Sequence, residues 1–124
     1  MKVEELMIGD WVNAFDVPKQ IEGIRTFKNG DEIVYYDWDN GNFITSVTPI
    51  PLTKEILEKN GFKKHRYYGY FIEQSNSGYY IYFDNNYLSI HQSGYDIIEF
   101  AWCEYVHELQ HALKLCGIEK EIVL

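Results

Sequence analysis

The chain has 124 residues, of which 46% are hydrophobic and 17% aromatic, so it can bury the core of one compact domain or of two small units. Its 19 acidic and 11 basic residues give a net charge of −8, which disfavours direct binding to nucleic acid, because phosphate-binding proteins gather basic residues. No apolar run is long enough for a membrane span or a secretory signal, so we predict a cytoplasmic protein without membrane association.

Turn signals divide the first part of the chain. Asn29-Gly30 and Asn40-Gly41 are dipeptides that tolerate positive φ at both centres of a tight hairpin. The β-forming residues around them predict an antiparallel meander with strands at 21–28, 31–39 and 42–48. Residues 6–12 are typical of a turn that leads into a further strand. Four short strands in this space favour a small SH3-like barrel or an open meander.

A proline-flanked segment, Pro49-Ile50-Pro51, ends this first sheet, because neither proline can donate a hydrogen bond to a strand neighbour. Thr53 has the side chain of a helix N-cap, and it predicts a short helix over residues 54–60. Gly61 supplies the left-handed residue that ends a helix, and Phe62 can fold back onto the last turn.

A second meander follows this helix. Turn residues separate four β-forming segments, at 66–74, 79–84, 87–91 and 95–101. Tyrosines recur on alternate residues, so we expect one aromatic face that needs a cover.

The last helix is predicted to supply this cover. Its apolar residues recur at helical spacings of four, three, four and three: Trp102, Val106, Leu109, Leu113 and Cys116. Gly117 is the expected stop, and the alternating residues of 118–124 are compatible with a terminal strand. The predicted fold class is therefore α+β and mainly antiparallel. Residues 1–48 form the barrel-like meander, and residues 49–124 hold the short helix, the second meander and the covering helix.

Residues 107–111, His-Glu-Leu-Gln-His, match the HExxH pattern of zinc hydrolases. Histidines at i and i+4 share a helix face and can hold one metal ion, while the glutamate acts as general base on the metal's water. The pattern makes a minimal zinc-dependent hydrolase the enzymatic alternative, with His107 and His111 as ligands, Glu108 as the catalytic base and zinc as the cofactor.

Other features favour two solvent-exposed histidines over a zinc site. A catalytic zinc usually takes a third protein ligand, and the only carboxylates after His111 are Glu119 and Glu121. At about 100° per residue, His107 and His111 lie nearly opposite the apolar stripe, on the face that we expect to meet solvent. We therefore favour a non-enzymatic protein without a cofactor.

Three blocks of the sequence carry a family resemblance: Ile8-Gly9-Asp10-Trp11-Val12, residues 49–57 with Gly61-Phe62, and residues 105–110. With these blocks the chain resembles an uncharacterised family of small proteins from gut anaerobes and their phages and other mobile elements. The resemblance implies an origin in a mobile element and brings no activity with it. The family pattern usually has Gln after the histidine and Asn after the block, so this chain departs from it at Glu108 and His111.

The two cysteines are predicted on one helix. Cys103 and Cys116 would lie about 20 Å apart along its axis, too far for a disulfide, so free thiols are expected. Cys103 and His107 also form an i, i+4 pair, but the sequence places no acid or oxyanion hole beside them, which favours a partly buried, unreactive thiol.

Residues 67–113 contain no Lys or Arg, but six acids and 13 of the 21 aromatic residues. This composition predicts an acidic, aromatic interaction surface that includes Tyr35, Trp38, Tyr68, Tyr70, Tyr80 and Tyr82. We therefore predict a protein-interaction module with a protein partner, and homo-oligomerisation if the tyrosine face stays uncovered. An acidic DNA-mimic inhibitor is the second alternative.

Overall fold

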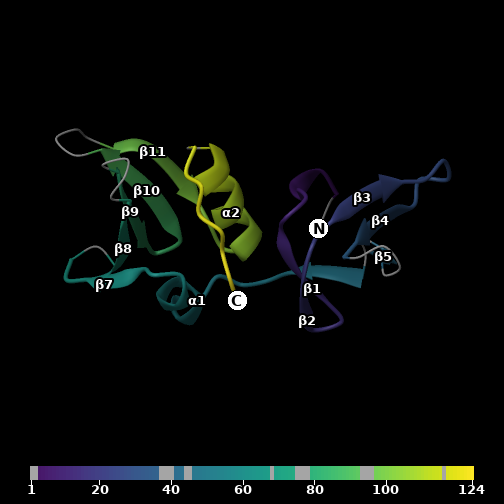
Figure 1. Ribbon diagram of the computed structural model, residues 1–124, viewed down its shortest axis with the longest axis horizontal. Coiled ribbons are helices and arrows are strands. Elements are labelled where there is room, and N and C mark those ends of the chain that lie inside the picture. Colours follow the sequence, from purple (N-terminus) through teal and green to yellow (C-terminus); the bar gives the residue numbers. More distant parts are fainter. Residues whose placement is uncertain are drawn as a thin grey trace. The chain divides into compact units, whose positions relative to one another are not determined.

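A computed structural model describes residues 3–36, 41–43, 46–67, 69–74, 79–92, 97–115 and 117–124. In this part of the chain, antiparallel strands make up most of the regular structure, with two α-helices and one short 3-10 helix, η1 (Val3–Glu5) (Figure 1). The predicted fold class, α+β with mainly antiparallel strands, is confirmed.

The chain divides into two compact units. Unit 1 comprises Met1–Pro51 with Tyr105–His107, and unit 2 comprises Leu52–Glu104 with Glu108–Leu124. We predicted the boundary between the units after residue 48, and in the structure it lies three residues later, after Pro51. Residues 105–107 belong to unit 1 although they are distant in sequence. An isolated β-bridge between Pro51 and Tyr105 connects them to it.

The first sheet of unit 1 has the strand order β2-β1-β6, with β2 at Val17–Gln20, β1 at Trp11–Ala14 and β6 at Val47–Pro49. The β1–β2 hairpin turns at Phe15 and Asp16, whose φ angles are +50° and +64°. Two left-handed residues in a two-residue turn match the natural twist of the flanking strands. We did not predict this hairpin, because Phe-Asp lacks the glycine or asparagine that usually marks such a turn.

The second sheet of unit 1 is a meander of β3 (Gly23–Thr26), β4 (Glu32–Tyr35) and β5 (Gly41–Phe43). Its first turn lies at Asn29-Gly30 as predicted, but only Gly30 has a positive φ, of +92°. The turn is longer than predicted, since Phe27 N donates to Asp31 O at 2.8 Å. Asn40, in the second predicted turn, lies outside the described residues.

The predicted strand at 42–48 is divided in the structure. Its start belongs to β5, whereas β6 leaves the meander and pairs with β1 on the other sheet. Pro49 therefore lies within β6, at the edge of its sheet, and does not follow it. The two sheets are separate and open, and closure into an SH3-like barrel stays a prediction.

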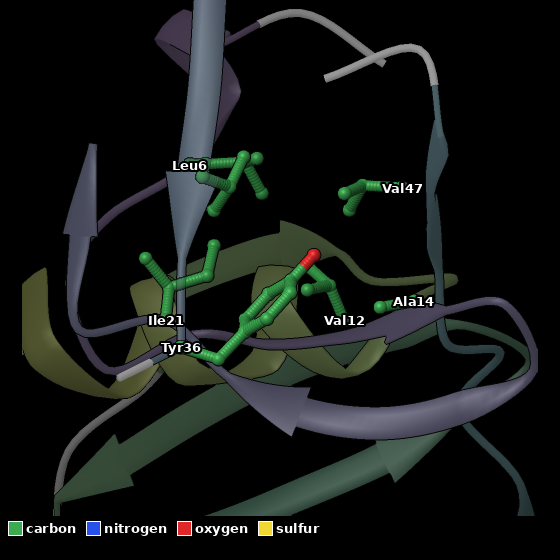
Figure 2. Packing of buried hydrophobic residues seen from close by; sticks show 7 residues of the cluster. Leu6, Val12, Ala14, Ile21, Tyr36 and Val47 are labelled. Atoms are coloured by element: carbon green, nitrogen blue, oxygen red, sulfur yellow. The ribbon is translucent and has the colours of Figure 1, made fainter. Parts of the chain in front are cut away.

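Buried apolar side chains from both sheets share one core in unit 1 (Figure 2), formed by Leu6, Val12, Ala14, Ile21, Val34, Tyr36 and Val47. The Tyr36 ring lies among aliphatic side chains, and its hydroxyl has no hydrogen-bond partner among the described residues. Loss of contact with water disfavours the phenolate and raises the pKa of Tyr36.

The turn before β1 explains the first sequence block. Gly9 has a φ of +97°, which lets its N–H donate to Ile21 O at 2.7 Å. The carboxylate of Asp10 is buried, and its Oδ2 accepts a hydrogen bond from Met7 N at 2.8 Å. The Gly-Asp pair therefore fixes the entry of the chain into the first sheet, which is a structural role.

Helix α1 (Lys54–Lys59) of unit 2 begins as predicted and ends one residue earlier, with Asn60 as its C-cap. The Thr53 Oγ1 accepts a hydrogen bond at 3.2 Å from a backbone N–H of the first turn. Gly61 follows the helix with a φ of +89°, and Phe62 N donates to Leu57 O at 3.0 Å. Phe62 and Leu57 are both buried, so the helix stop also adds to the core.

Unit 2 contains a five-stranded antiparallel sheet in the order β11-β10-β9-β8-β7. Its strands are β7 (Lys63–His65), β8 (Gly69–Gln74), β9 (Tyr79–Asp84), β10 (Tyr87–Gln92) and β11 (Ile97–Trp102). The second meander is thus confirmed, and β9 and β10 turn at Asn85-Asn86 as expected, with φ angles of +48° and +69°. The first strand was missed, because its Lys-Lys-His sequence looked like a solvated loop.

Helix α2 (Val106–Leu115) begins later than the apolar stripe suggests. Trp102 fits the helical spacing, but it ends strand β11. The predicted stop is confirmed: Gly117 has a φ of +72°, and Ile118 N donates to Leu113 O at 2.9 Å.

The predicted terminal strand is wrong. Residues 118–124 have no regular secondary structure, although Ile118 and Ile122 are buried. The segment is tied to α1 by Asn60, whose Nδ2 donates to Val123 O and whose Oδ1 accepts from Val123 N, both at 2.8 Å. Hydrogen bonds from the side-chain amide of Asn60 thus take the place of the backbone hydrogen bonds that a neighbouring strand would make.

Candidate functional site

The strand register assigns the side chains of the five-stranded sheet to two faces. The core face carries the buried residues Ile81, Phe83, Leu88 and Ile90. The opposite face, called the outer face below, carries Lys63, His65, Phe71, Glu73, Tyr80, Tyr82, Asp84, Tyr87, Ser89, His91 and Trp102. Helix α2 and the C-terminal segment lie on one side of the sheet (Figure 1). We predicted that this helix covers the aromatic face. The face that carries Tyr70 and Ile72 is the buried one, as predicted, although three of its buried residues, Ile81, Leu88 and Ile90, are aliphatic.

Tyr82 is the centre of a set of ring contacts on the outer face. Its centroid lies 5.7 Å from that of His65 and 5.0 Å from that of His91, both edge-on. It also stacks on Phe71 with 6.1 Å between centroids. All four rings are half-buried, and each such pair adds about 0.5–1.5 kcal/mol beyond the buried area. The contacts hold the rings in fixed positions while part of each remains accessible.

Basic groups gather at the β7 edge of the outer face. Lys63 is exposed there, and the Arg66 guanidinium lies over the Tyr67 ring at 5.6 Å. The Nδ1 atom of His65 accepts a hydrogen bond from Tyr67 N at 3.0 Å. The neutral imidazole therefore carries its proton on Nε2. No further Lys or Arg occurs until after Leu113, so the rest of the face is without cations from its own strands.

Tyr87 and Trp102 form a second ring pair at the far end of the outer face. Their centroids are 4.7 Å apart with an interplanar angle of 82°, and each side chain is 45% exposed. Trp102 Nε1 donates to Glu104 Oε1 at 2.8 Å. Asp84 is the direct neighbour of Tyr87 in the β9–β10 pairing and is exposed. Two carboxylates thus border this aromatic pair.

The structure brings together only part of the predicted interaction surface. Tyr80 and Tyr82 share the outer face, but Tyr35 belongs to β4 of unit 1 and is half-buried. Trp38 and Tyr68 lie outside the described residues. Within unit 2, the strand register therefore places two of the predicted residues, Tyr80 and Tyr82, on one face.

Tyr70 points away from the outer face. The pairing register puts it on the core face, and its hydroxyl donates to Glu58 Oε1 at 3.2 Å. Desolvation raises the pKa of Tyr70, and the hydrogen bond to Glu58 raises it further. This tyrosine connects β8 to α1 and has a structural role.

Sequence reasoning missed five outer-face residues that carry rings, namely His65, Phe71, Tyr87, His91 and Trp102. The alternation of Tyr87, Ser89 and His91 in β10 was a visible signal that these side chains share a face. It was not sufficient, because alternation alone does not tell which face a helix covers.

The HExxH histidines do not both meet solvent. His107 is only 5% exposed, and its ring stacks on that of Tyr105 with 5.9 Å between centroids and 10° between planes. His111 is half-buried. The predicted exposure is therefore wrong for His107. Since Val106 is buried beside it, the first turn of α2 is covered on more than one face.

Glu108 has a structural role at the start of α2. Its Oε1 accepts a hydrogen bond from Glu104 N at 3.0 Å. A carboxylate in the first turn satisfies a backbone donor and interacts favourably with the positive end of the helix. Among the described residues, no three His, Cys, Asp or Glu side chains are grouped as a metal ion would need. A zinc site at His107 and His111 stays a prediction.

Cys103 is a free, fully buried thiol. It precedes α2, so its predicted place on the helix with His107 is wrong, and Cys116 lies outside the described residues. Burial raises the pKa of Cys103 to about 12, with a further contribution from the charge of Glu108. Almost no thiolate exists at neutral pH, so this cysteine is not an activated nucleophile.

The chain matches no protein-family model, no curated protein and no solved structure. Its resemblance to the small proteins of gut anaerobes and their phages therefore stays a prediction. No helix in the described ranges is long and apolar enough to cross a membrane.

Proposed function

We propose that this protein is a non-enzymatic interaction module that binds a protein partner through the outer face. The observation that carries the proposal is the ring network around Tyr82, which stays half-exposed on a sheet whose other face is buried. Rings that are held in place by one another lose little conformational freedom on binding. They also supply large contact areas, and Tyr and Trp are enriched among the residues that dominate binding energy.

Charge supports a protein partner with a basic surface. The chain has a net charge of −8, and the outer face includes the exposed carboxylates of Glu73 and Asp84. Opposite charges on a partner would speed association and fix its orientation. The same charge would repel the phosphates of nucleic acid. We extend the proposal to a cytoplasmic protein, as predicted from the sequence, and to a mobile-element origin, as the family resemblance implies.

The interaction module is preferred to the two alternatives. A zinc-dependent hydrolase would use His107 and Glu108, yet one is buried against Tyr105 and the other caps α2. No specific observation favours an acidic DNA mimic. Both alternatives stay predictions, and the outer face carries the proposed function.

A binding screen with matched variants tests the proposal. Purified wild-type protein is screened against an array of host proteins, and each hit is measured again with the purified partner by calorimetry. We expect Tyr80→Ser or Tyr82→Ser to weaken binding about tenfold or more, as loss of a central aromatic contact does. Phe15→Ser removes an exposed aromatic side chain from unit 1 and is the control.

The outcome is decided by which variant changes the affinity. Thermal unfolding of each variant first establishes that it is folded under the assay conditions. Partners whose affinity is the same for the wild type and both tyrosine variants would show that the outer face is not the binding surface.

A further inference from the structure

The Tyr87–Trp102 pair differs from the ring network around Tyr82. Both side chains keep 45% of their surface exposed although their rings are in contact at 4.7 Å. The one polar group of the indole, Nε1–H, is directed to Glu104 Oε1. What the indole presents elsewhere is π surface, whose negative face attracts cations.

Carboxylates strengthen this attraction. Glu104 is fixed beside the indole by the 2.8 Å hydrogen bond, and Asp84 is paired with Tyr87 across β9 and β10. Both acids are exposed, so they remain available for a ligand from solution. Strands β8 to β11 contain no Lys or Arg, so these strands supply no cation of their own to this site.

Elsewhere the chain supplies such cations itself. The Arg25 guanidinium lies over the Phe27 ring at 4.6 Å, and that of Arg66 lies over Tyr67 at 5.6 Å. Both contacts are local in sequence and pair a planar cation with an aromatic ring. The Tyr87–Trp102 site has the same aromatic half of the interaction, with two carboxylates added.

We propose that Tyr87, Trp102, Glu104 and Asp84 form a binding site for an arginine side chain of a partner protein. This inference rests on the proposed function and names the partner's chemistry at one end of the outer face. Arginine fits better than lysine because its guanidinium is planar, weakly hydrated and able to stack on a ring. In the same position it can donate paired hydrogen bonds to a carboxylate.

Nuclear magnetic resonance of the full chain tests the site with defined probes. Three blocked tripeptides, Gly-Arg-Gly, Gly-Lys-Gly and Gly-citrulline-Gly, are titrated into ¹⁵N-labelled protein at low salt. The indole N–H signal of Trp102, identified by its absence in Trp102→Phe, should shift with the arginine peptide. It should shift at least about threefold less at equal concentration with lysine, and not at all with neutral citrulline.

Matched substitutions of two glutamates test which carboxylate contributes to arginine binding. Glu104→Gln keeps the side-chain shape and the acceptor for Trp102 Nε1, and it should weaken arginine binding about tenfold. Glu73→Gln removes one charge from the same face at β8 and should leave the affinity unchanged. Equal shifts with lysine or citrulline, or equal losses in the two acid variants, would overturn the arginine site.

Failure of this inference and failure of the proposed function are separable. A protein partner that requires Tyr82, combined with arginine peptides that do not shift Trp102, contradicts only the arginine site. In the reverse case, arginine peptides bind at Trp102, but the affinity for protein partners does not change when outer-face residues are substituted. This result contradicts the proposed function and supports the arginine site.

Discussion

The hydroxyl of Tyr36 lies in the core of unit 1 without a hydrogen-bond partner among the described residues. A buried polar group in such a position costs about 1–3 kcal/mol of folding free energy. We therefore expect Tyr36→Phe to keep the free energy of unfolding or raise it by about 1 kcal/mol, measured by urea denaturation. Tyr36→Leu, which leaves a cavity, is the destabilised reference. A loss of stability in Tyr36→Phe would mean that the hydroxyl is hydrogen-bonded.

Cys103 makes stability depend on alkaline pH. Its pKa is raised from 9.0 to about 12, so the folded state keeps the thiol proton to a higher pH than the unfolded state does. The stabilisation is fully present below about pH 9 and is lost as the pH rises towards 12. The slope is at most about 1.4 kcal/mol per pH unit. In urea denaturation at several pH values, wild type should lose stability more steeply than Cys103→Ala, and parallel curves would contradict this.

Individual side chains also show where sequence reasoning fails. The positions of Thr53 and Gly61 at the ends of α1 were predictable, because capping depends on the residue and its immediate neighbours. The burial of His107 was not, because a helical wheel assumes one covered face and one face in solvent. His107 lies opposite the apolar stripe and is buried all the same.

Helix α2 depends on Glu108 for the start of its first turn. We expect Glu108→Ala to lower the free energy of unfolding by about 1 kcal/mol. Glu108→Gln should lower it less, because Gln keeps the acceptor for Glu104 N and loses only the charge. Thermal unfolding followed by circular dichroism, with and without a metal chelator, measures both. A zinc-dependent rise in Tm that His111→Ala removes would instead support the hydrolase alternative.

The C-terminal segment depends on Asn60 for its attachment to α1. This side chain is 5% exposed and makes two hydrogen bonds to Val123 and one to Ile56 O at 2.8 Å. We expect Asn60→Ala to destabilise the protein by about 2–3 kcal/mol and to speed hydrogen exchange at the Val123 amide. Asn60→Asp keeps the acceptor for Val123 N and should protect this amide better. Unchanged exchange in Asn60→Ala would show that the segment is held by its buried isoleucines alone.

The elements that were predicted well have local causes. Strand β9 has the predicted bounds, because turn residues border it on both sides. By contrast, β7 was missed and residues 118–124 were assigned to a strand that does not form. Whether an alternating segment becomes a strand depends on a sheet neighbour, which belongs to another part of the chain and is not visible in the segment itself.

The outer face of unit 2 is another feature that its sequence predicts only in part. The sequence indicates that residues 67–113 are rich in aromatic side chains and free of Lys and Arg. It does not indicate that Tyr82 faces outward and Tyr70 inward, because this depends on which face of the finished sheet α2 and the C-terminal segment cover. The composition of the candidate site was therefore predictable, whereas its geometry was not.

The acidic charge should keep copies of the protein apart. At pH 7 the net charge is −8, and near the isoelectric pH of about 4.9 this repulsion disappears. We expect self-association to increase between pH 7 and 5, measured by sedimentation velocity, and to be weaker in Tyr82→Ser than in wild type. Phe15→Ser is the control outside unit 2. Equal association of Tyr82→Ser and wild type would show that the outer face does not mediate it.

The Asn60–Val123 link spans 63 residues of chain, which has a consequence for synthesis. A growing polypeptide leaves the ribosome from its N-terminus, so the β-hairpins can pair while the amide of Asn60 is still hydrated. Completion of unit 2 has to wait for Val123 to emerge. Until then the surface that Ile118 and Ile122 later occupy is open to chaperones and to other nascent chains. Slow translation of the codons for residues 118–124 would lengthen the time for which this surface is exposed.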